Sequence, residues 1–490
     1  MDKLKKYVEI FNENDEETVV NLIDNAHAYE WLKKEIPLFS CPDEEIERTY
    51  YFRWWTFRKH LKKTPEGYVV TEFLPKVNWS GKYNTINAPT AHHLCEGRWL
   101  KNAKEYMKDY AYFFFNNPEK SHHYSNWLIS ALYDLSSVTG DFVYDETFLQ
   151  RIKKYYERWE EEHGLKNGMF FSYDNYDAME CSISGRTARG VERKGVRPTL
   201  NSYMCADALA ISKFARVFND EKTASEYLAK HEKLKNQINE NLFKDGFYRA
   251  FHYDGDSFDE SIFDNYDGEK VREEIGYIPW MFCIPPKNRE HVFSLLLDKD
   301  CFYTPYGIAS ADKSHEKYLY KVNHECLWNG YVWPFATSQT LKALINVINE
   351  YNDEQKYRDT FVTLFTQYAK SHKRVREDGK TVDWIDEVRH PERDEWSSRE
   401  ILKNWGWKED KGGYERGKDY NHSTFCDLIL CGIVGVDTNS ESLKLNPIIP
   451  KDWKWFKVEN LHYRGKTYTV TYDESGDKFG MGKGIKIIEQ

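Results

Sequence analysis

Long helix-like segments, separated by long aromatic loops, constrain the fold of this 490-residue chain more than any other feature. Apolar residues recur in these segments at three-to-four spacing, as a helix with one buried face requires. The ranges predicted to be helical are 126–138, 201–218, 224–242, 330–349, 354–370 and 420–434. Strands do not alternate with these helices, which argues against a parallel sheet at the centre.

The loops are the second constraint on the fold. The longest are rich in Trp, Tyr, Asp, His and Gly, and they cover 76–98, 164–200, 245–280, 301–329 and 380–420. Loops 164–200 and 380–420 exceed the length of passive connections in a compact domain. Short loops on one side of helical hairpins and long loops on the other favour a ring of helix pairs with one functional mouth.

The last fifty residues change character. Ranges 443–447 and 467–472 alternate apolar and polar residues, which predicts strands, and range 68–74 is a further, shorter strand prediction. A small β appendage on a helical body is therefore expected.

Charge and cysteine usage limit the partners and the compartment. A net charge of −10 argues against nucleic acid or an anionic membrane as a partner. The sequence has no apolar run long enough to cross a membrane, and its start lacks the apolar segment of a signal peptide. The nine cysteines are scattered without CxxC spacing, as expected for reduced thiols in a cytoplasmic protein. The oligomeric state stays open.

Two carboxylate-rich segments, 176–182 and 384–391, lie beside aromatic residues and between helical ranges. A fold that brings them together would supply what hydrolysis of a glycosidic bond requires. One carboxyl group protonates the leaving oxygen, and the other ionises a water on the opposite face of the sugar. The 16 Trp and 35 Tyr residues offer flat surfaces on which sugars stack. No metal or organic cofactor is needed for this reaction.

The segment Trp328-Asn329-Gly330-Tyr331-Val332-Trp333-Pro334 resembles the W-x-G-x-x-W-P motif of the inverting (α/α)6-barrel glycosidases. This clan holds trehalases, the processing α-glucosidases of glycoside hydrolase family 63 and mannosylglycerate hydrolase. The chain is most similar to the mannosylglycerate-hydrolase-like glycoside hydrolase domain. Further matching segments are 50–55, 72–75, 91–99, 197–203 and 419–427.

The resemblance covers most of the chain and implies an all-α fold with an (α/α)6 barrel. We expect an N-terminal part (1–90) of helices and short strands, a catalytic barrel (91–435) and a C-terminal β extension (436–490). The motifs point to fold and reaction class and leave the sugar, its anomer and exo or endo action open.

The resemblance also implies the catalytic pair. Residues 178–182 match the clan's acid segment G-M-D-N-S with Glu in place of Asp, so the general acid falls on Glu180. Because Glu is one methylene longer than Asp, Asp177 is kept as the alternative acid. Glu387, before His390-Pro391, matches the general base.

Sugar-binding residues are expected around this pair. The expected aromatic walls are Trp54, Trp55, Trp328 and Trp333, each of which could equally pack in the core. Polar groups expected to recognise hydroxyls are Arg53, His92, His93, Glu96, Arg98 and His422. Four arginines near the acid belong to a mobile lid, bind a carboxylate-bearing aglycone or lie in a solvated loop; they are Arg186, Arg189, Arg193 and Arg197.

Two other functions compete with an inverting glycosidase that cleaves a terminal sugar from a small oligosaccharide or glycoconjugate. A sugar epimerase or isomerase on the same barrel would use His92 or His93 together with His422 as bases. An inactive carbohydrate-binding protein would explain the Glu at position 180 as decay of the acid.

Overall fold

The computed structural model describes residues 3–117, 121–187, 190–252, 258–263 and 270–490. Helices dominate it, and a small antiparallel sheet lies near the C-terminus. The longer α-helices are α1 (Lys3–Glu13), α2 (Ala28–Glu35), α3 (Glu44–His60), α4 (Thr90–Gly97), α5 (Ala103–Asn116), α7 (Leu128–Thr139), α8 (Phe148–His163), α9 (Pro198–Val217), α10 (Glu221–Gln237), α12 (Pro334–Asn346), α13 (Gln355–Lys370) and α14 (Ser397–Asn404).

Four of the predicted helices are confirmed. Range 126–138 is α7, range 201–218 is α9 and range 354–370 is α13. Range 224–242 is α10 followed by one π-helical turn, and α10 packs beside α9 after a three-residue link. In contrast, α3 escaped prediction because it is buried on nearly every side and shows no single apolar stripe.

Two helix predictions began too early. Range 330–349 becomes helical only at Pro334, because Trp333 is extended and the proline occupies the first helical turn. Range 420–434 becomes helical only at Cys426. The residues before Cys426 form a loop whose backbone bonds elsewhere: the Asn421 amide donates to the carbonyl of Glu72 at 3.1 Å.

The C-terminal sheet has the strand order β1-β12-β13-β14 and is antiparallel throughout. Its strands are β1 (Leu38–Ser40), β12 (Trp455–Tyr463), β13 (Lys466–Asp473) and β14 (Gly484–Glu489). Strand β13 confirms the prediction for 467–472, whereas 443–447 forms only a single bridge between Leu445 and Val436. Strand β3 (Gly67–Val70), paired with β2 (Leu61–Thr64), takes up the first part of range 68–74.

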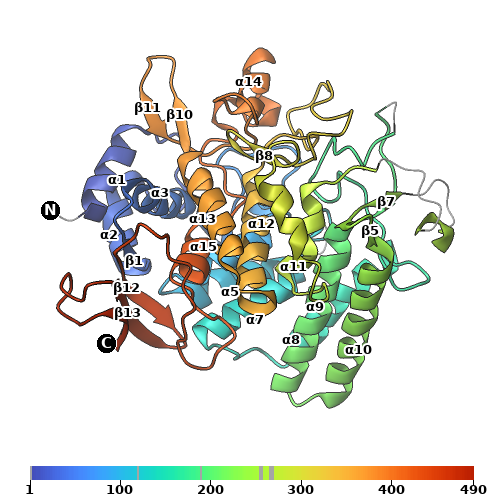
Figure 1. Cartoon of the computed structure of the whole chain (residues 1–490), viewed down its shortest axis with the longest axis horizontal. Helices are drawn as coiled ribbons and strands as arrows, with labels where there is room; N and C mark the ends of the chain where they lie inside the picture. The colour runs from blue at the N-terminus through green and yellow to red at the C-terminus, as the bar shows by residue number, and fades with distance from the viewer. Residues whose placement is uncertain (1–2, 118–120, 188–189, 253–257, 264–269) are drawn as a thin grey trace.

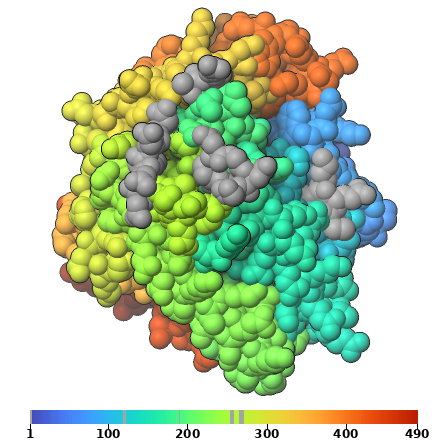
Figure 2. Space-filling model, turned by 90° about the vertical axis from the view of Figure 1, so that its right-hand side faces the viewer, coloured from blue at the N-terminus to red at the C-terminus, as the bar shows by residue number. Residues whose placement is uncertain are grey.

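The N-terminal helices and the C-terminal sheet lie side by side, because β1 pairs with β12 (Figure 1). Helices α8, α9 and α10 reach the opposite lower edge of the molecule, where their connections are short (Figures 1 and 2). One continuous apolar core runs from Leu4 to Val470 across all of these elements. The predicted domain boundaries at 90 and 435 stay predictions.

The long loops gather at the other end of the helices, around α14 and the hairpin of β10 (Lys373–Val375) and β11 (Thr381–Asp383) (Figure 1). Loop 164–197 joins α8 to α9 there, and it carries the first of the two carboxylate-rich segments. Among the described residues, no helix is long and apolar enough to span a membrane.

Candidate active site

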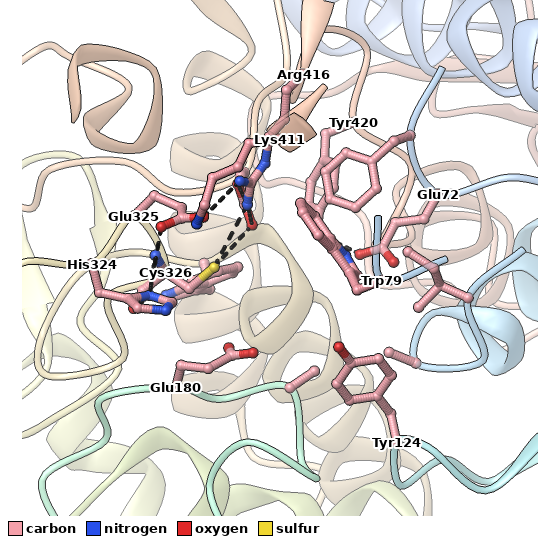
Figure 3. Close-up of a pocket in the computed structure, with 16 residues that line it drawn as sticks. Glu72, Trp79, Tyr124, Glu180, His324, Glu325, Cys326, Lys411, Arg416 and Tyr420 are labelled. Atoms are coloured by element: carbon pink, nitrogen blue, oxygen red, sulfur yellow. Dashed lines mark hydrogen bonds and ion pairs between the residues drawn. The ribbon is translucent and has the colours of Figure 1, made fainter. Parts of the chain in front are cut away.

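A cavity of about 200 Å³ opens among these loops (Figure 3). Its walls combine four carboxyl groups, two cations and a set of aromatic rings, and they come from six separate parts of the chain. The lining residues are Glu72, Phe73, Trp79, Ile86, Ala88, Tyr124, Ala178, Glu180, His324, Glu325, Cys326, Trp333, Glu387, Lys411, Arg416 and Tyr420. Both carboxylates that the sequence singled out as a pair, Glu180 and Glu387, are thus brought to one cavity.

Glu180 lies on a tightly turned part of loop 164–197. Its neighbours Ala178 and Cys181 have φ angles of 56° and 66°, a left-handed conformation that costs free energy in residues other than glycine. The Met179 amide donates to the Asp174 carbonyl at 2.8 Å, and the Glu180 carbonyl accepts from the Trp328 amide at 3.2 Å. These contacts hold the turn so that the Glu180 carboxyl projects into the cavity (Figure 3).

The surroundings of Glu180 favour its protonated form. Burial, together with the charges of Asp174 and Glu387, raises the pKa of its carboxyl to about 8 against the opposing effect of Arg416. At neutral pH this carboxyl therefore holds a proton that it can donate.

Glu387 follows β11, and two other side chains donate hydrogen bonds to its carboxylate. Arg416 Nη2 donates to both of its carboxylate oxygens at 3.0 Å, and the Cys326 thiol donates to Oε1 at 3.2 Å. Burial raises the pKa of Glu387, while the Arg416 guanidinium opposes this shift. The pairing stabilises the ionised form of a carboxyl that has almost no contact with solvent.

Arg416 is itself held by the cavity wall. Its Nη1 donates to Glu325 Oε1 at 2.7 Å, Lys411 pairs with the same carboxylate, and the Trp79 ring lies 4.7 Å from the guanidinium carbon. The next residue, Gly417, has φ +76°, and a Cβ there would lie 2.0 Å from Asp386 Oδ1. Glycine thus lets the Arg416 loop pass close to the segment that carries Glu387.

Glu72 is a third buried carboxyl in the cavity, and the sequence assigned it no role. It follows β3, and the Tyr420 hydroxyl donates to it. Burial raises its pKa to about 8. The segment 72–75 belongs to the family resemblance, which was the available signal. Nothing in the sequence marked Glu325, Cys326 or Arg416, because they reach the cavity only through the folding of the long loops.

Asp177, the alternative acid, does not line the cavity. Arg197 Nε donates to its carboxylate at 2.6 Å, Ser125 and Ser172 donate at 2.8 and 2.9 Å, and the Thr199 hydroxyl donates as well. All of its acceptor directions are used inside the protein, so it braces the loop beside Glu180.

The four tryptophans expected as walls are placed differently from one another. Trp333 lines the cavity, and Trp328 is stacked behind it with ring centroids 4.3 Å apart. Trp54 and Trp55 do not line the cavity: they are buried within α3, where the Trp55 indole donates to Asn12 at 2.8 Å. Their place on a helix that is buried all round explains the difference.

The residues expected to recognise hydroxyls also lie outside the cavity lining. Arg53 donates to the Ser423 carbonyl at 2.6 Å, and Arg98 donates to Asp427 at 2.7 Å. Glu96 accepts from the amides of Phe425, Cys426 and Asp427 and so caps the helix that begins at Cys426. These three charged groups are buried and bind the chain to itself.

The three histidines lie behind the cavity wall. His93 bonds the Asn421 carbonyl at 2.6 Å, and the His92 ring packs 4.4 Å from the ring of Phe335. His422 packs 3.8 Å from the ring of Tyr420, which does line the cavity. Burial lowers the pKa of all three imidazoles.

The arginines near the acid do not form a free basic cluster in the described part of the loop. Arg186 pairs with Asp174 at 2.6 Å and Arg197 with Asp177 at 2.6 Å. Arg189 lies outside the described residues. Within the described ranges, no group of three or more His, Cys, Asp or Glu side chains is arranged to hold a metal ion.

Comparisons with known proteins place these features in a family. Residues 82–423 match the model of the mannosylglycerate hydrolase MGH1-like glycoside hydrolase domain. Residues 436–488 match that of the C-terminal domain of glycosyl hydrolase family 65. A search of the curated proteins gave no match.

Solved structures give further likenesses. A structure titled sialidase is 33% identical, with a TM-score of 0.88, over 99% of this chain and 43% of its own. The α-L-rhamnosidase from Dictyoglumus thermophilum (12% identity, TM-score 0.52) matches over 90% of this chain and 43% of its own. The GH78 rhamnosidase of Bacillus sp. GL1 (12% identity, TM-score 0.57) matches over 89% of this chain and 40% of its own. The chain thus spans less than half the length of these three proteins, and the two rhamnosidases show the fold alone.

Proposed function

Since the chain belongs to the mannosylglycerate hydrolase MGH1-like glycoside hydrolase domain family and is a glycosidase, we propose that it hydrolyses a terminal glycosidic bond with inversion. Glu180 acts as the general acid and Glu387 as the general base. The observation that carries this proposal is the shared cavity. Glu180 enters it from one side, and Cys326 and Arg416 lie on the other (Figure 3). These two side chains bond the Glu387 carboxylate, which lines the same cavity. The open space between Glu180 and this group is where a sugar ring and a water molecule would lie.

The chemistry follows from the two protonation states. Glu180 donates its proton to the glycosidic oxygen as the bond from that oxygen to the anomeric carbon breaks. Glu387 takes a proton from water, whose oxygen bonds to the anomeric carbon on the opposite face. Arg416 and the Cys326 thiol orient the Glu387 carboxylate for this step.

We further propose that the terminal sugar is neutral. The cavity carries four carboxyl groups, and its two cations, Lys411 and Arg416, are both paired with them. A sugar acid such as sialic acid would bring a further negative charge, and the described lining offers no unpaired Lys or Arg to receive it. Glu72 and Tyr420 offer hydrogen-bonding groups suited to hydroxyls instead.

The epimerase alternative has less support. It requires His92, His93 or His422 as proton carriers, and none of these lines the cavity.

Two finer expectations for the molecule belong to the same proposal. They are that its helix pairs close into an (α/α)6 barrel and that the protein is located in the cytoplasm. The location is supported by nine free cysteines, eight of them buried.

The test is a screen of nitrophenyl glycosides and disaccharides of neutral and acidic sugars, with proton NMR of the first product formed. The proposal predicts hydrolysis of a neutral glycoside with release of the opposite anomer. Release of the same anomer would contradict inversion, and interconversion of free sugars without hydrolysis would favour the epimerase. Preferential release of sialic acid would contradict the neutral sugar alone.

A further inference from the structure

A second and larger pocket, of about 540 Å³, adjoins the first at Glu180. The two pockets share Tyr124, Glu180 and His324. The lining residues are His123, Tyr124, Asn175, Tyr176, Glu180, Cys181, Arg186, Glu192, Val322, Asn323 and His324. No step of the proposed hydrolysis of the terminal sugar uses this space.

The position of Glu180 gives the outer pocket a direction. A general acid protonates the bond between the two halves of the substrate, so the leaving group extends from the cavity past the acid. A cavity of about 150 Å³ encloses one benzene molecule, so the 200 Å³ cavity suits one six-membered sugar ring. The remainder of a longer substrate then falls in the outer pocket.

The lining of the outer pocket suits sugar rings. Tyr176 is 37% exposed, and its ring rests against those of His163 and Tyr173, each with a centroid distance of 5.5 Å. Such a ring offers an apolar face on which the C–H side of a sugar stacks. The amides of Asn175 and Asn323 add hydrogen-bonding groups on the same lining.

Charge in the outer pocket argues against an acidic leaving group. Its arginine, Arg186, donates to Asp174 at 2.6 Å and to Asn175 at 2.7 Å, so its charge is already balanced. Glu192 adds a negative charge on the same lining. A carboxylate-bearing aglycone would have to displace Asp174 from the guanidinium.

We propose that the outer pocket binds the leaving group as a neutral chain of two sugar residues, with the Tyr176 ring as its stacking surface. This proposal rests on the proposed glycosidase function. It turns the substrate class from any small glycoside into a neutral oligosaccharide of at least three residues.

The probes are a disaccharide, a trisaccharide and a glycosyl fluoride that carry the neutral sugar identified by the screen. In the wild-type enzyme, KM should fall about tenfold from the disaccharide to the trisaccharide. Tyr176→Ala should lower kcat/KM for the trisaccharide at least about tenfold more than for the fluoride, whose leaving group does not reach the pocket. Tyr176→Phe keeps the ring and should retain the wild-type ratio.

Tyr112→Ala is the matched control, because this tyrosine lies on α5 and lines neither pocket. It should change no ratio. Equal KM values for disaccharide and trisaccharide, or equal losses on all probes in Tyr176→Ala, would overturn the inference. Glu387→Gln, assayed on the same probes, separates this inference from the glycosidase proposal. If the variant is inactive, the glycosidase proposal stands even where the outer-pocket inference has failed. If the variant remains active, the glycosidase proposal itself fails. Tighter binding of a carboxylated trisaccharide would contradict the neutral chain.

Discussion

Glu180 and Glu387 enter one cavity from surroundings of opposite kinds. Glu180 sits on a turn flanked by two left-handed residues, and burial raises its pKa to about 8. Glu387 is equally enclosed, but a guanidinium and a thiol donate three hydrogen bonds to its oxygens. The first surroundings favour a protonated carboxyl, and the cation in the second favours an ionised one, although the side chains are the same.

The contrast teaches that partners, rather than burial alone, divide the roles. Burial raises the pKa of both carboxyl groups, and only Glu387 has a cation bonded to it. Asp177, three residues before Glu180, has still more partners. Arg197 and three hydroxyl groups donate hydrogen bonds to its two carboxylate oxygens. A carboxyl bonded so completely has no oxygen left for a substrate.

The largest effect is expected when the charged member of the pair is neutralised. Glu387→Gln should lower kcat by about 1,000-fold or more on both disaccharides and glycosyl fluorides, since water must be activated whatever group leaves. Steady-state rates on both substrate classes give the measurement. A loss confined to one substrate class would contradict the role of Glu387 as the ionised general base.

Removal of the cation tests the source of that charge. Arg416→Gln should lower kcat by about 10- to 100-fold, because charge-assisted hydrogen bonds to the base are lost. The acid limb of the pH profile should also move to higher pH, since Arg416 opposes the rise of the Glu387 pKa. Lys411→Gln, which removes the other partner of Glu325, should leave that limb in place. An unmoved limb in Arg416→Gln would contradict the role given to this arginine.

The thiol should matter less than the guanidinium. Cys326→Ala removes one neutral hydrogen bond to Glu387 and should lower kcat about three- to tenfold. Cys326→Ser restores a donor and should recover most of the loss. If serine is no better than alanine, the thiol packs against Glu387 without orienting it.

The smallest expected effect is on Tm, and replacing a carboxyl by an amide should change it in opposite directions at Glu180 and Glu325. Between the ordinary Glu pKa of 4.5 and about 8, folded Glu180 retains a proton that the unfolded chain releases, so stability falls as pH rises through this window. Glu180→Gln should therefore raise Tm by about 2 °C at pH 8 and by little at pH 4. Glu325, whose pKa its partners Arg416 and Lys411 lower to about 2, should behave oppositely, with Glu325→Gln lowering Tm at pH 7. Thermal scans at pH 4, 7 and 8 give the measurement, and a lower Tm for Glu180→Gln than for the wild type at pH 8 would contradict the raised pKa.

The sequence predicted α10 and α13, whose buried residues fall on one face, but not α8, which also buries a single face. It missed α3, which is buried all round, and misplaced the start of the helix at Cys426. There the preceding loop bonds to Glu72, far away in the chain. Periodicity reports local burial, and it carries no information on contacts between distant segments.

The site divides in the same way. Glu180, Glu387 and Trp333, which line the cavity, were proposed as site residues because they stand in short motifs that resemble a family. Arg416 and Cys326 stand in no motif and meet Glu387 only when three loops converge. The polar residues Arg53, Glu96 and Arg98 were expected in the site and lie outside the cavity lining. A polar motif has the same sequence whether its side chains bind a ligand or bond to the backbone of a buried helix.

The division of roles between Glu180 and Glu387 is tested most directly by the leaving-group dependence of Glu180→Gln. With the proton donor removed, kcat/KM on a disaccharide should fall by about 100-fold or more. On the fluoride of the same sugar it should fall much less, because fluoride departs with little help from an acid. The basic limb expected near pH 8 for the wild-type enzyme should also disappear. Equal losses on the disaccharide and the fluoride, with the basic limb retained, would contradict the assignment of Glu180 as the acid.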